Sequence, residues 1–286
     1  MKKILIIGSS GFIGRNTARF FTQAGYEVAE LNCIQKSADF QNIELIYNHL
    51  KENTPDIILN CAGSFTNNFM TDFNANFVLP RNLLESVLKT TCKIKVILLG
   101  SASEYGLITE KENPVTENRR LNPISIYGFT KKLQTELMRF YCEKYDMDIN
   151  IARLFNVYGK ELSKQLFIGN LYAQIRDYKT KKNDKIILGN LNTKRDYYDI
   201  QNICNDLQII CECGKSGEVY NVAAGYSTLL KDIVNKVFLE EQIPPDVLET
   251  DMNKQQSNGY DLSDIYADTT KINELKELYA GDNKIH

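Results

Sequence analysis

The fold is decided near the N-terminus, by the stretch Lys3-Ile4-Leu5-Ile6-Ile7-Gly8-Ser9-Ser10-Gly11-Phe12-Ile13-Gly14. Its apolar first half predicts a short buried strand, and the periodicity from Arg15 to Ala24 predicts a helix directly after the glycines. A strand, a glycine loop and a helix in this order let the backbone approach a pyrophosphate, which the helix N-terminus stabilises. The glycine spacing is G-x-x-G-x-x-G. We therefore predict a dinucleotide site whose contacts come from Gly8, Ser10, Gly11, Phe12, Ile13 and Gly14.

Strand-like apolar runs alternate with helical patterns along the next part of the chain. Strands are predicted at 26–31, 56–59, 95–101 and 149–154, and helices at 74–89 and 127–145. This alternation is typical of an α/β protein with a doubly wound parallel sheet, the Rossmann arrangement. We expect a smaller C-terminal substrate-binding region to follow it.

Tyr127 and Lys131 stand four residues apart at the start of the second predicted helix. On a helix they project from one face, so the ammonium would favour the phenolate and lower the pKa of the tyrosine. A third group, the hydroxyl of Ser101, ends a predicted strand and would open onto the same site. We predict these three side chains as catalytic. The alternative for the pair alone is a surface helix with a lysine whose stem covers apolar surface.

The composition argues against several other classes of protein. The chain has 286 residues, a net charge of −2, 43% apolar and 24% charged residues, which fit one large globular domain or two small ones. Without a basic stripe we expect no nucleic-acid partner, and without an apolar run of roughly 18–20 residues we expect no membrane span. Seven scattered cysteines favour reduced thiols in the cytoplasm. The two histidines, His49 and His286, argue against a metal site.

The end of the second predicted strand bears on the choice of dinucleotide. NAD-specific enzymes place an acid there to hold the ribose 2′-hydroxyl, whereas this chain has Asn32. A 2′-phosphate is then not repelled, and Lys36 or Arg15 could pair with it. We predict NADP as the cofactor, with NAD as the alternative. Small residues after the strand at 56–59 would let the backbone lie against adenine and ribose; they are Cys61, Ala62 and Gly63.

Taken together, these motifs resemble the extended short-chain dehydrogenase/reductases, the family of nucleotide-sugar epimerases, dehydratases and reductases. The resemblance rests on four segments in order: Gly8 to Gly14, the strand end at Ser101, Tyr127-x-x-x-Lys131, and Arg153 to Gly159. It implies that Tyr127 is the acid/base and that Ser101 hydrogen-bonds the reacting sugar oxygen. It also implies that Lys131 binds the nicotinamide ribose and lowers the pKa of the tyrosine.

The resemblance further implies contacts with a nucleotide-sugar substrate. Arg195, followed by Asp196, would meet the nucleotide diphosphate, because a guanidinium fork can bond two phosphate oxygens together. A purely structural pair of these two residues is the alternative. Other substrate contacts are expected from Ser103, Asn156 and Asn170, and a cofactor contact from Asn76. The Rossmann domain would comprise 1–160 with 195–225, and the nucleotide-sugar-binding region 161–194 with 226–286.

Within the family, the chain is most similar to the GDP-4-keto-6-deoxymannose reductases, through Leu99 to Gly106 and Gly189 to Asp196. Dehydratases carry an acid pair directly after their catalytic hydroxyl, where this chain has Ala102 and Ser103; we interpret Glu104 as structural. The resemblance implies hydride transfer from NADPH to the C4 ketone of a nucleotide-linked 4-keto-6-deoxy sugar, with a GDP-sugar favoured, in deoxysugar and polysaccharide biosynthesis. The alternatives are a 4-epimerase with tightly bound NAD and a non-catalytic dinucleotide-binding scaffold.

The resemblance also bears on assembly and on the end of the chain. The helices predicted at 74–89 and 127–145 resemble the pair that forms a four-helix bundle in dimeric relatives, so we expect a homodimer. An arginine that often completes diphosphate binding is replaced by Asn258, so a CDP-, dTDP- or UDP-sugar is an alternative to a GDP-sugar. After Lys271 we expect no closing helix.

Overall fold

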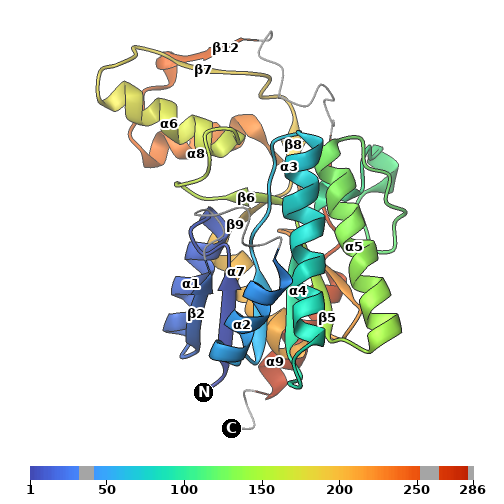
Figure 1. The fold of residues 1–286 in the computed structure, drawn as a ribbon. Coiled ribbons are helices and arrows are strands. Elements are labelled where there is room, and N and C mark those ends of the chain that lie inside the picture. Colours follow the sequence, from blue (N-terminus) through green and yellow to red (C-terminus); the bar gives the residue numbers. More distant parts are fainter. Residues whose placement is uncertain (32–41, 252–263, 283–286) are drawn as a thin grey trace.

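The computed structural model describes residues 1–31, 42–251 and 264–282. At its centre is a parallel sheet of six strands in the order β10-β5-β4-β3-β1-β2 (Figure 1). The strands are β1 (Lys3–Ile7), β2 (Glu27–Leu31), β3 (Ile57–Asn60), β4 (Lys95–Ser101), β5 (Ile149–Leu154) and β10 (Val219–Val222). The predicted doubly wound parallel sheet is confirmed.

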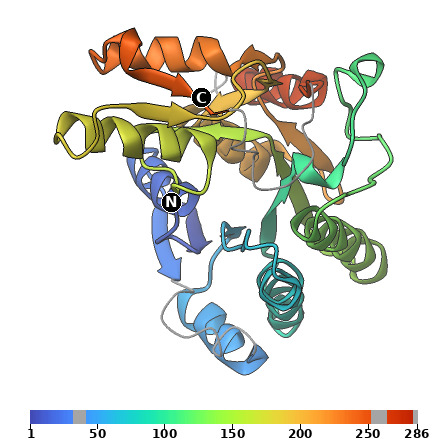
Figure 2. The same ribbon diagram turned by 90° about the horizontal axis from the view of Figure 1, so that it is seen from above.

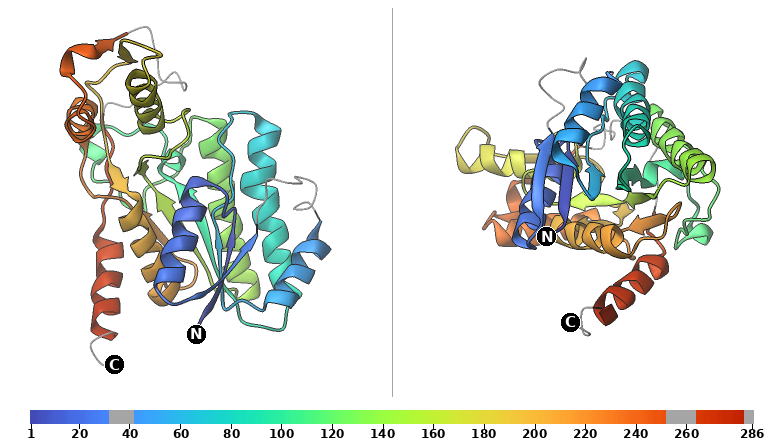
Figure 3. Two further views of the ribbon diagram at one scale, coloured as in Figure 1. Left: turned by 90° about the vertical axis from the view of Figure 1, so that its left-hand side faces the viewer. Right: turned by 60° about the horizontal axis from the view of Figure 1, so that its bottom comes forward.

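Each strand presents alternate residues to opposite faces, and helices cover both. On β1, Ile4 and Ile6 belong to one apolar cluster, whereas Leu5 and Ile7 belong to the other. The first cluster is shared with α1 (Phe12–Gln23), α7 (Ile200–Cys213) and α9 (Thr270–Asp282), and the second with α2 (Ile43–Asn53), α4 (Leu79–Leu88) and α5 (Ile126–Tyr145). The views in Figure 2 and Figure 3 show the sheet between these two helical layers.

The strand order reverses at β1, which has β2 on one side and β3 on the other. The glycine loop after β1 and the segment after β3 therefore meet at the carboxyl edge of the sheet. There the amide of Cys61 donates to the carbonyl oxygen of Ile7 at 2.9 Å. Open α/β sheets bind their ligands at such a reversal, outside the carboxyl ends of the strands.

A smaller region with its own apolar core lies beyond that edge, at the top of Figure 1. Its core includes Leu171 and Val234, both fully buried. The region is built from α6 (Phe167–Lys179), β7 (Ile186–Leu188), α8 (Leu230–Glu240), η5 (Pro245–Val247) and β12 (Leu248–Thr250). Two short pairings connect it to the sheet: β6 (Asn156–Tyr158) with β9 (Tyr197–Asp199), and β8 (Lys194–Arg195) with β11 (Thr228–Leu229).

Two predictions about helices are corrected by the structure. The helix predicted at 74–89 consists of the π-helical η2 (Asn74–Val78) followed by α4, and a further short helix, α3 (Phe69–Phe73), directly precedes it. The expectation that no helix follows Lys271 is wrong, because α9 occupies 270–282. Ile272 and Leu275 of α9 bury their side chains in the core shared with α7, so this helix covers the sheet. It does so although it lies within 226–286, which were predicted to belong to the nucleotide-sugar-binding region.

Within the described ranges, none of the helices combines the length and the apolar content needed to cross a membrane.

Candidate active site

Ser101, Tyr127 and Lys131 converge at the carboxyl end of β4. Ser101 ends the strand, and its hydroxyl is hydrogen-bonded to the phenol of Tyr127 in the first turn of α5. One turn later, the Nζ atom of Lys131 donates to the carbonyl oxygen of Leu99 at 2.8 Å. The structure thus brings together the three side chains that were predicted to be catalytic.

The start of α5 explains how this convergence is possible. Ser125 caps the helix, its Oγ accepting from the amide of Gly128 at 3.0 Å. A Cβ atom on Gly128 would lie 2.4 Å from the carbonyl oxygen of Ser103. Only glycine therefore lets the turn that carries Tyr127 rest on the segment that follows β4.

The hydroxyl of Ser101 is oriented by its neighbours. Its oxygen accepts from the amide of Ser103 at 3.2 Å, which leaves its proton available for Tyr127 or for a sugar oxygen. The amide of Ser101 donates to Oε1 of Glu104 at 2.8 Å, so Ser101 and Glu104 form a capping box around η3 (Ala102–Glu104).

Burial shifts the pKa values of the other two groups. Burial, with the charges of Glu104 and Asp72, raises the pKa of Tyr127 to about 12, against the lowering effect of the hydrogen bond from Ser101. Burial lowers the pKa of Lys131 to about 8, against the charges of Glu104, Cys61 and Asp72. The sequence predicts a lowered pKa for Tyr127. This prediction is wrong, because the protein groups around the phenol raise its pKa on balance. The phenol is neutral at pH 7, the form that can donate a proton.

Two residues that were not predicted from the sequence, Phe65 and Asp72, shape the surroundings of Tyr127. The ring of Phe65 meets that of Tyr127 edge-on, with centroids 4.8 Å apart. Asp72 is fully buried and holds the loop that carries Phe65, accepting from the amides of Thr66 and Asn67 at 2.9 Å each. The only feature of the sequence that could have indicated a role for Phe65 is its position just after the small residues that follow β3.

The loop after β1 has the geometry of a phosphate cradle. A Cβ atom on Gly14 would lie 2.2 Å from the carbonyl oxygen of Gly8, so the loop closes only over glycine. Gly11 is the N-cap residue of α1, and no side chain caps the helix, so its first amides face the loop. These observations fit a dinucleotide pyrophosphate. The other predicted contacts of this loop lie on it or in the first turn of α1: Ser10, Phe12 and Ile13.

The residues predicted to select the cofactor have different outcomes. Arg15 forms an ion pair with Glu161 at 2.8 Å and donates to its carbonyl oxygen at 3.1 Å. Asn32 and Lys36 lie outside the described residues.

Asn76 joins the segment after β3 to α5. Its Oδ1 accepts from the amide of Ser64 at 3.0 Å, and its Nδ2 donates to the carbonyl oxygen of Ser64 and to Oγ1 of Thr130. It is fully buried, so it acts as a brace. In front of it, a Cβ atom on Gly63 would lie 3.3 Å from Nζ of Lys131. The predicted segment of Cys61, Ala62 and Gly63 thus borders Lys131.

Three of the residues predicted to bind substrate lie on elements that form the smaller region or connect it to the sheet: Asn156 on β6, Asn170 on α6 and Arg195 on β8. Nδ2 of Asn156 donates to the carbonyl oxygen of Asp196 at 3.2 Å, and Oδ1 of Asn170 accepts from Gln174 at 3.3 Å. Arg195 is buried on β8 and donates to the carbonyl oxygen of Lys194 at 2.7 Å. Ser103, half-buried, follows Ser101 in η3.

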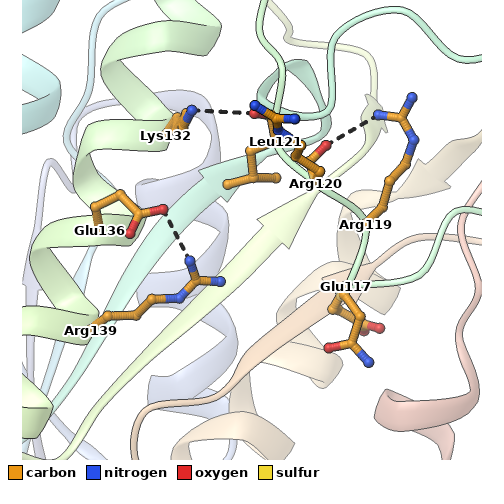
Figure 4. A pocket seen from close by; sticks show the side chains of 8 residues that line it. Glu117, Arg119, Arg120, Leu121, Lys132, Glu136 and Arg139 are labelled. Atoms are coloured by element: carbon orange, nitrogen blue, oxygen red, sulfur yellow. Dashed lines mark hydrogen bonds and ion pairs between the residues drawn. The ribbon is translucent and has the colours of Figure 1, made fainter.

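A separate pocket of about 290 Å³ lies between α5 and the loop before it (Figure 4). Two of the cations in its lining form ion pairs: Arg139 with Glu136 at 3.0 Å, and Arg119 with Glu112 at 2.7 Å. Ser101, Tyr127 and Lys131 are absent from its lining, which comprises Glu117, Asn118, Arg119, Arg120, Leu121, Lys132, Glu136 and Arg139. Among the described residues, no cluster of side chains could hold a metal ion.

This arrangement of a glycine cradle, a serine, a tyrosine and a lysine agrees with a comparison with known families. Residues 4–223 match the model of the NAD dependent epimerase/dehydratase family. The chain belongs to this family. It is an enzyme of the epimerase/dehydratase type, and the resemblance inferred from its motifs is confirmed.

Members of the epimerase/dehydratase family that resemble this chain include two proteins named for GDP-linked deoxysugars. GDP-6-deoxy-D-talose 4-dehydrogenase of Aggregatibacter actinomycetemcomitans is 25% identical over 228 residues, which cover 78% of this chain and 74% of the relative. GDP-6-deoxy-D-mannose reductase of Pseudomonas aeruginosa is 21% identical over 240 residues, which cover 82% and 78%.

Among solved structures, RMD from Pseudomonas aeruginosa complexed with NADPH has the same fold. Its TM-score with this chain is 0.84 at 18% identity, over 96% of this chain and 92% of the other.

Proposed function

We propose that this enzyme uses NADPH to reduce the C4 ketone of a nucleotide-linked 4-keto-6-deoxy sugar, with a GDP-sugar as the favoured substrate. The observation that carries the proposal is the convergence of Ser101, Tyr127 and Lys131 beside the phosphate cradle. The names of the two curated relatives, a 4-dehydrogenase and a reductase of GDP-linked 6-deoxy sugars, support the choice of sugar.

In this reaction the protein's own groups handle the proton and the developing charge. NADPH, when bound, supplies a hydride. The neutral phenol of Tyr127 protonates the alkoxide oxygen that forms at C4. The hydroxyl of Ser101, whose lone pair is held by the amide of Ser103, donates to the same oxygen where charge develops.

Lys131 stabilises the phenolate that remains. Its ammonium stands one helical turn from Tyr127 and is anchored by the carbonyl oxygen of Leu99. An ammonium near a phenolate favours the ionised form, so proton transfer from the tyrosine becomes easier as the reaction proceeds. Nζ also donates to Oε1 of Gln134 at 3.5 Å, and its remaining proton would bind the nicotinamide ribose.

The absence of an acid pair after Ser101 supports reduction over dehydration. Ala102 and Ser103 occupy the two positions, and neither can serve as a carboxylic acid or base. The next residue, Glu104, is fully buried.

Other assignments belong to the same proposal. The loop from Gly8 to Gly14, with Cys61, Ala62 and Gly63, would bind the dinucleotide. Ser103, Asn156, Asn170 and Arg195 would bind the nucleotide diphosphate and the sugar. The enzyme would work as a cytoplasmic homodimer through α4 and α5, which lie side by side (Figure 1).

The test is to supply nucleotide-linked 4-keto-6-deoxy sugars with NADPH and to follow nicotinamide oxidation, identifying the product by mass spectrometry. Reduction of a GDP-linked ketone is expected. Failure with every nucleotide base would contradict a reductase. A product epimeric at C4, formed without net use of NADPH by protein that co-purifies with NAD, would establish the epimerase.

A further inference from the structure

Glu104 and Arg153 form an ion pair that is fully buried, with Oε2 and Nη2 2.8 Å apart. Removing two charges from water costs free energy that the pair recovers only with good geometry and further hydrogen bonds. Glu104 has these bonds. Its Oε1 accepts from the amide of Ser101 at 2.8 Å, and its Oε2 accepts from the hydroxyl of Thr135 at 2.7 Å.

These partners lie on the two elements that carry the catalytic side chains. Ser101 ends β4, whereas Thr135 follows Lys131 by four residues on the same face of α5. The carboxylate reaches both because Gly100 lacks a side chain: a Cβ atom there would lie 2.7 Å from Oε1 of Glu104. One carboxylate thus joins the end of β4 to α5.

Arg153 anchors the carboxylate from the other side. Its Nη1 donates to the hydroxyl of Tyr105 at 3.0 Å, and that hydroxyl donates to Oδ1 of Asn221 on β10 at 2.7 Å. The guanidinium also lies over the ring of Tyr105, 4.7 Å from its centroid. Glu104 is therefore fixed by a chain of contacts through β5 and β10.

We propose that Glu104 is a positioning residue of the active site: its buried carboxylate, held by Arg153, sets the distance between Ser101 and the face of α5 that carries Tyr127 and Lys131. The inference rests on the proposed function for its effect on turnover. The electrostatic effect of the Glu104 carboxylate on the pKa of Lys131 can be measured without a substrate.

The coupling is visible in the charges around Lys131. Burial lowers the pKa of this ammonium, and the negative charges that oppose burial are those of Glu104, Cys61 and Asp72. Of the three, Glu104 has the largest effect. Glu104→Gln removes that charge and keeps the shape, so the pKa of Lys131 should fall further.

The experiment measures the pKa of Lys131 by NMR of protein with ¹³C-labelled lysine, with the signal assigned from Lys131→Met. In Glu104→Gln the titration should move about one pH unit below that of the unsubstituted protein. Glu117→Gln is the matched control, because Glu117 also accepts a backbone amide, that of Asn221 at 2.8 Å, but does not act on Lys131. It should leave the titration in place.

A second variant covers the case in which the single substitution leaves Arg153 unpaired and prevents folding. Glu104→Gln with Arg153→Met removes both charges, which buried sites often tolerate. We expect the double variant to fold and to lose about tenfold or more in kcat through misplacement of the catalytic groups.

An unchanged titration of Lys131 in Glu104→Gln would overturn the inference and leave the proposed function intact. So would a double variant that does not fold, or one that folds with kcat unchanged. Conversely, absence of turnover in the unsubstituted enzyme, with the titration shifted as expected in Glu104→Gln, would count against the proposed function alone.

Discussion

At the scale of single residues, burial disfavours the charged form of Tyr127 and of Lys131, with opposite results. Tyr127 stays protonated well above neutral pH. Lys131, with a pKa of about 8, loses its proton only slightly above neutral pH. The limiting ionisation of the site on the alkaline side is therefore that of the lysine. Both residues can be tested by small changes.

Tyr127→Phe removes the proton donor and keeps the ring that meets Phe65. The value of kcat should fall about 10²–10⁴-fold, the usual contribution of general acid catalysis, with little change in the Kd of NADPH. Stopped assays of ketone reduction and fluorescence titration of NADPH measure the two quantities. Tyr141→Phe, on the same helix and hydrogen-bonded to Glu85, is the control and should keep normal turnover. Equal losses in both variants would mean that the phenol of Tyr127 has no special role.

Lys131 predicts a pH dependence for the binding of NADPH. Below about pH 8 the ammonium is protonated and can donate to the ribose; above it the charge is lost. The Kd should therefore rise by about tenfold or more as the pH increases through this value, because a hydrogen bond from a charged group contributes about 1.5–3 kcal/mol. Calorimetry over this range measures it.

Lys131→Met should bind weakly at every pH. Lys132→Met is the neighbouring control: Nζ of Lys132 donates to the carbonyl oxygen of Leu121 outside the site, so its Kd should follow the unsubstituted profile. A flat profile in the unsubstituted enzyme would rule out a role for the charge of Lys131.

At the scale of elements, Asp196 holds three segments together between the sheet and the smaller region. Its Oδ1 accepts from the amide of Ala224 at 2.8 Å, and its Oδ2 accepts from those of Gly225 at 3.0 Å and Ala267 at 3.2 Å. Asp196→Asn puts a donor where at least one of these amides needs an acceptor, since the single carboxamide oxygen can replace only one of the two carboxylate oxygens. The free energy of unfolding should fall by about 1–3 kcal/mol, the cost of an unsatisfied buried group.

Urea unfolding tests this effect against Asp199→Asn. Asp199 caps α7 through one oxygen, which accepts from the amide of Gln201 at 2.8 Å, and asparagine caps a helix about equally well. The control should therefore change stability little. Similar losses in the two variants would show that Asp196 is not a tether.

Elements and site were predictable from sequence to different extents. The strand at 149–154 is found with the predicted bounds, since buried parallel strands show as short apolar runs. The sequence also indicated the site, because Tyr127 and Lys131 are four residues apart and a helix places residues at this spacing on one face. The contact of Glu104 with Arg153 joins residues 49 positions apart, and no local pattern records such a pairing. The closing helix was missed although Ile272, Leu275 and Tyr279 have helical spacing.

At the scale of the whole molecule, Figure 1 shows α4 and α5 side by side on one flank of the sheet. Phe129 and Phe140 on α5 are 42% and 49% exposed, although large apolar side chains normally gain free energy by burial. They stand eleven residues apart, close to three helical turns, and so share one face. An apolar face of this kind is what a homodimer through α4 and α5 would cover.

The combination of Phe129→Glu with Phe140→Glu should make the protein monomeric, because each carboxylate would have to be buried without a partner in the proposed interface. Light scattering after size-exclusion chromatography measures the mass. Leu239→Glu is the control, since Leu239 is 83% exposed on α8, away from this flank, and should leave a dimer intact. The predicted catalytic groups and the cradle come from one chain, so the monomer should keep its affinity for NADPH. A dimer that survives the double substitution must use another surface, and a monomeric unsubstituted protein would remove the dimer from the proposal.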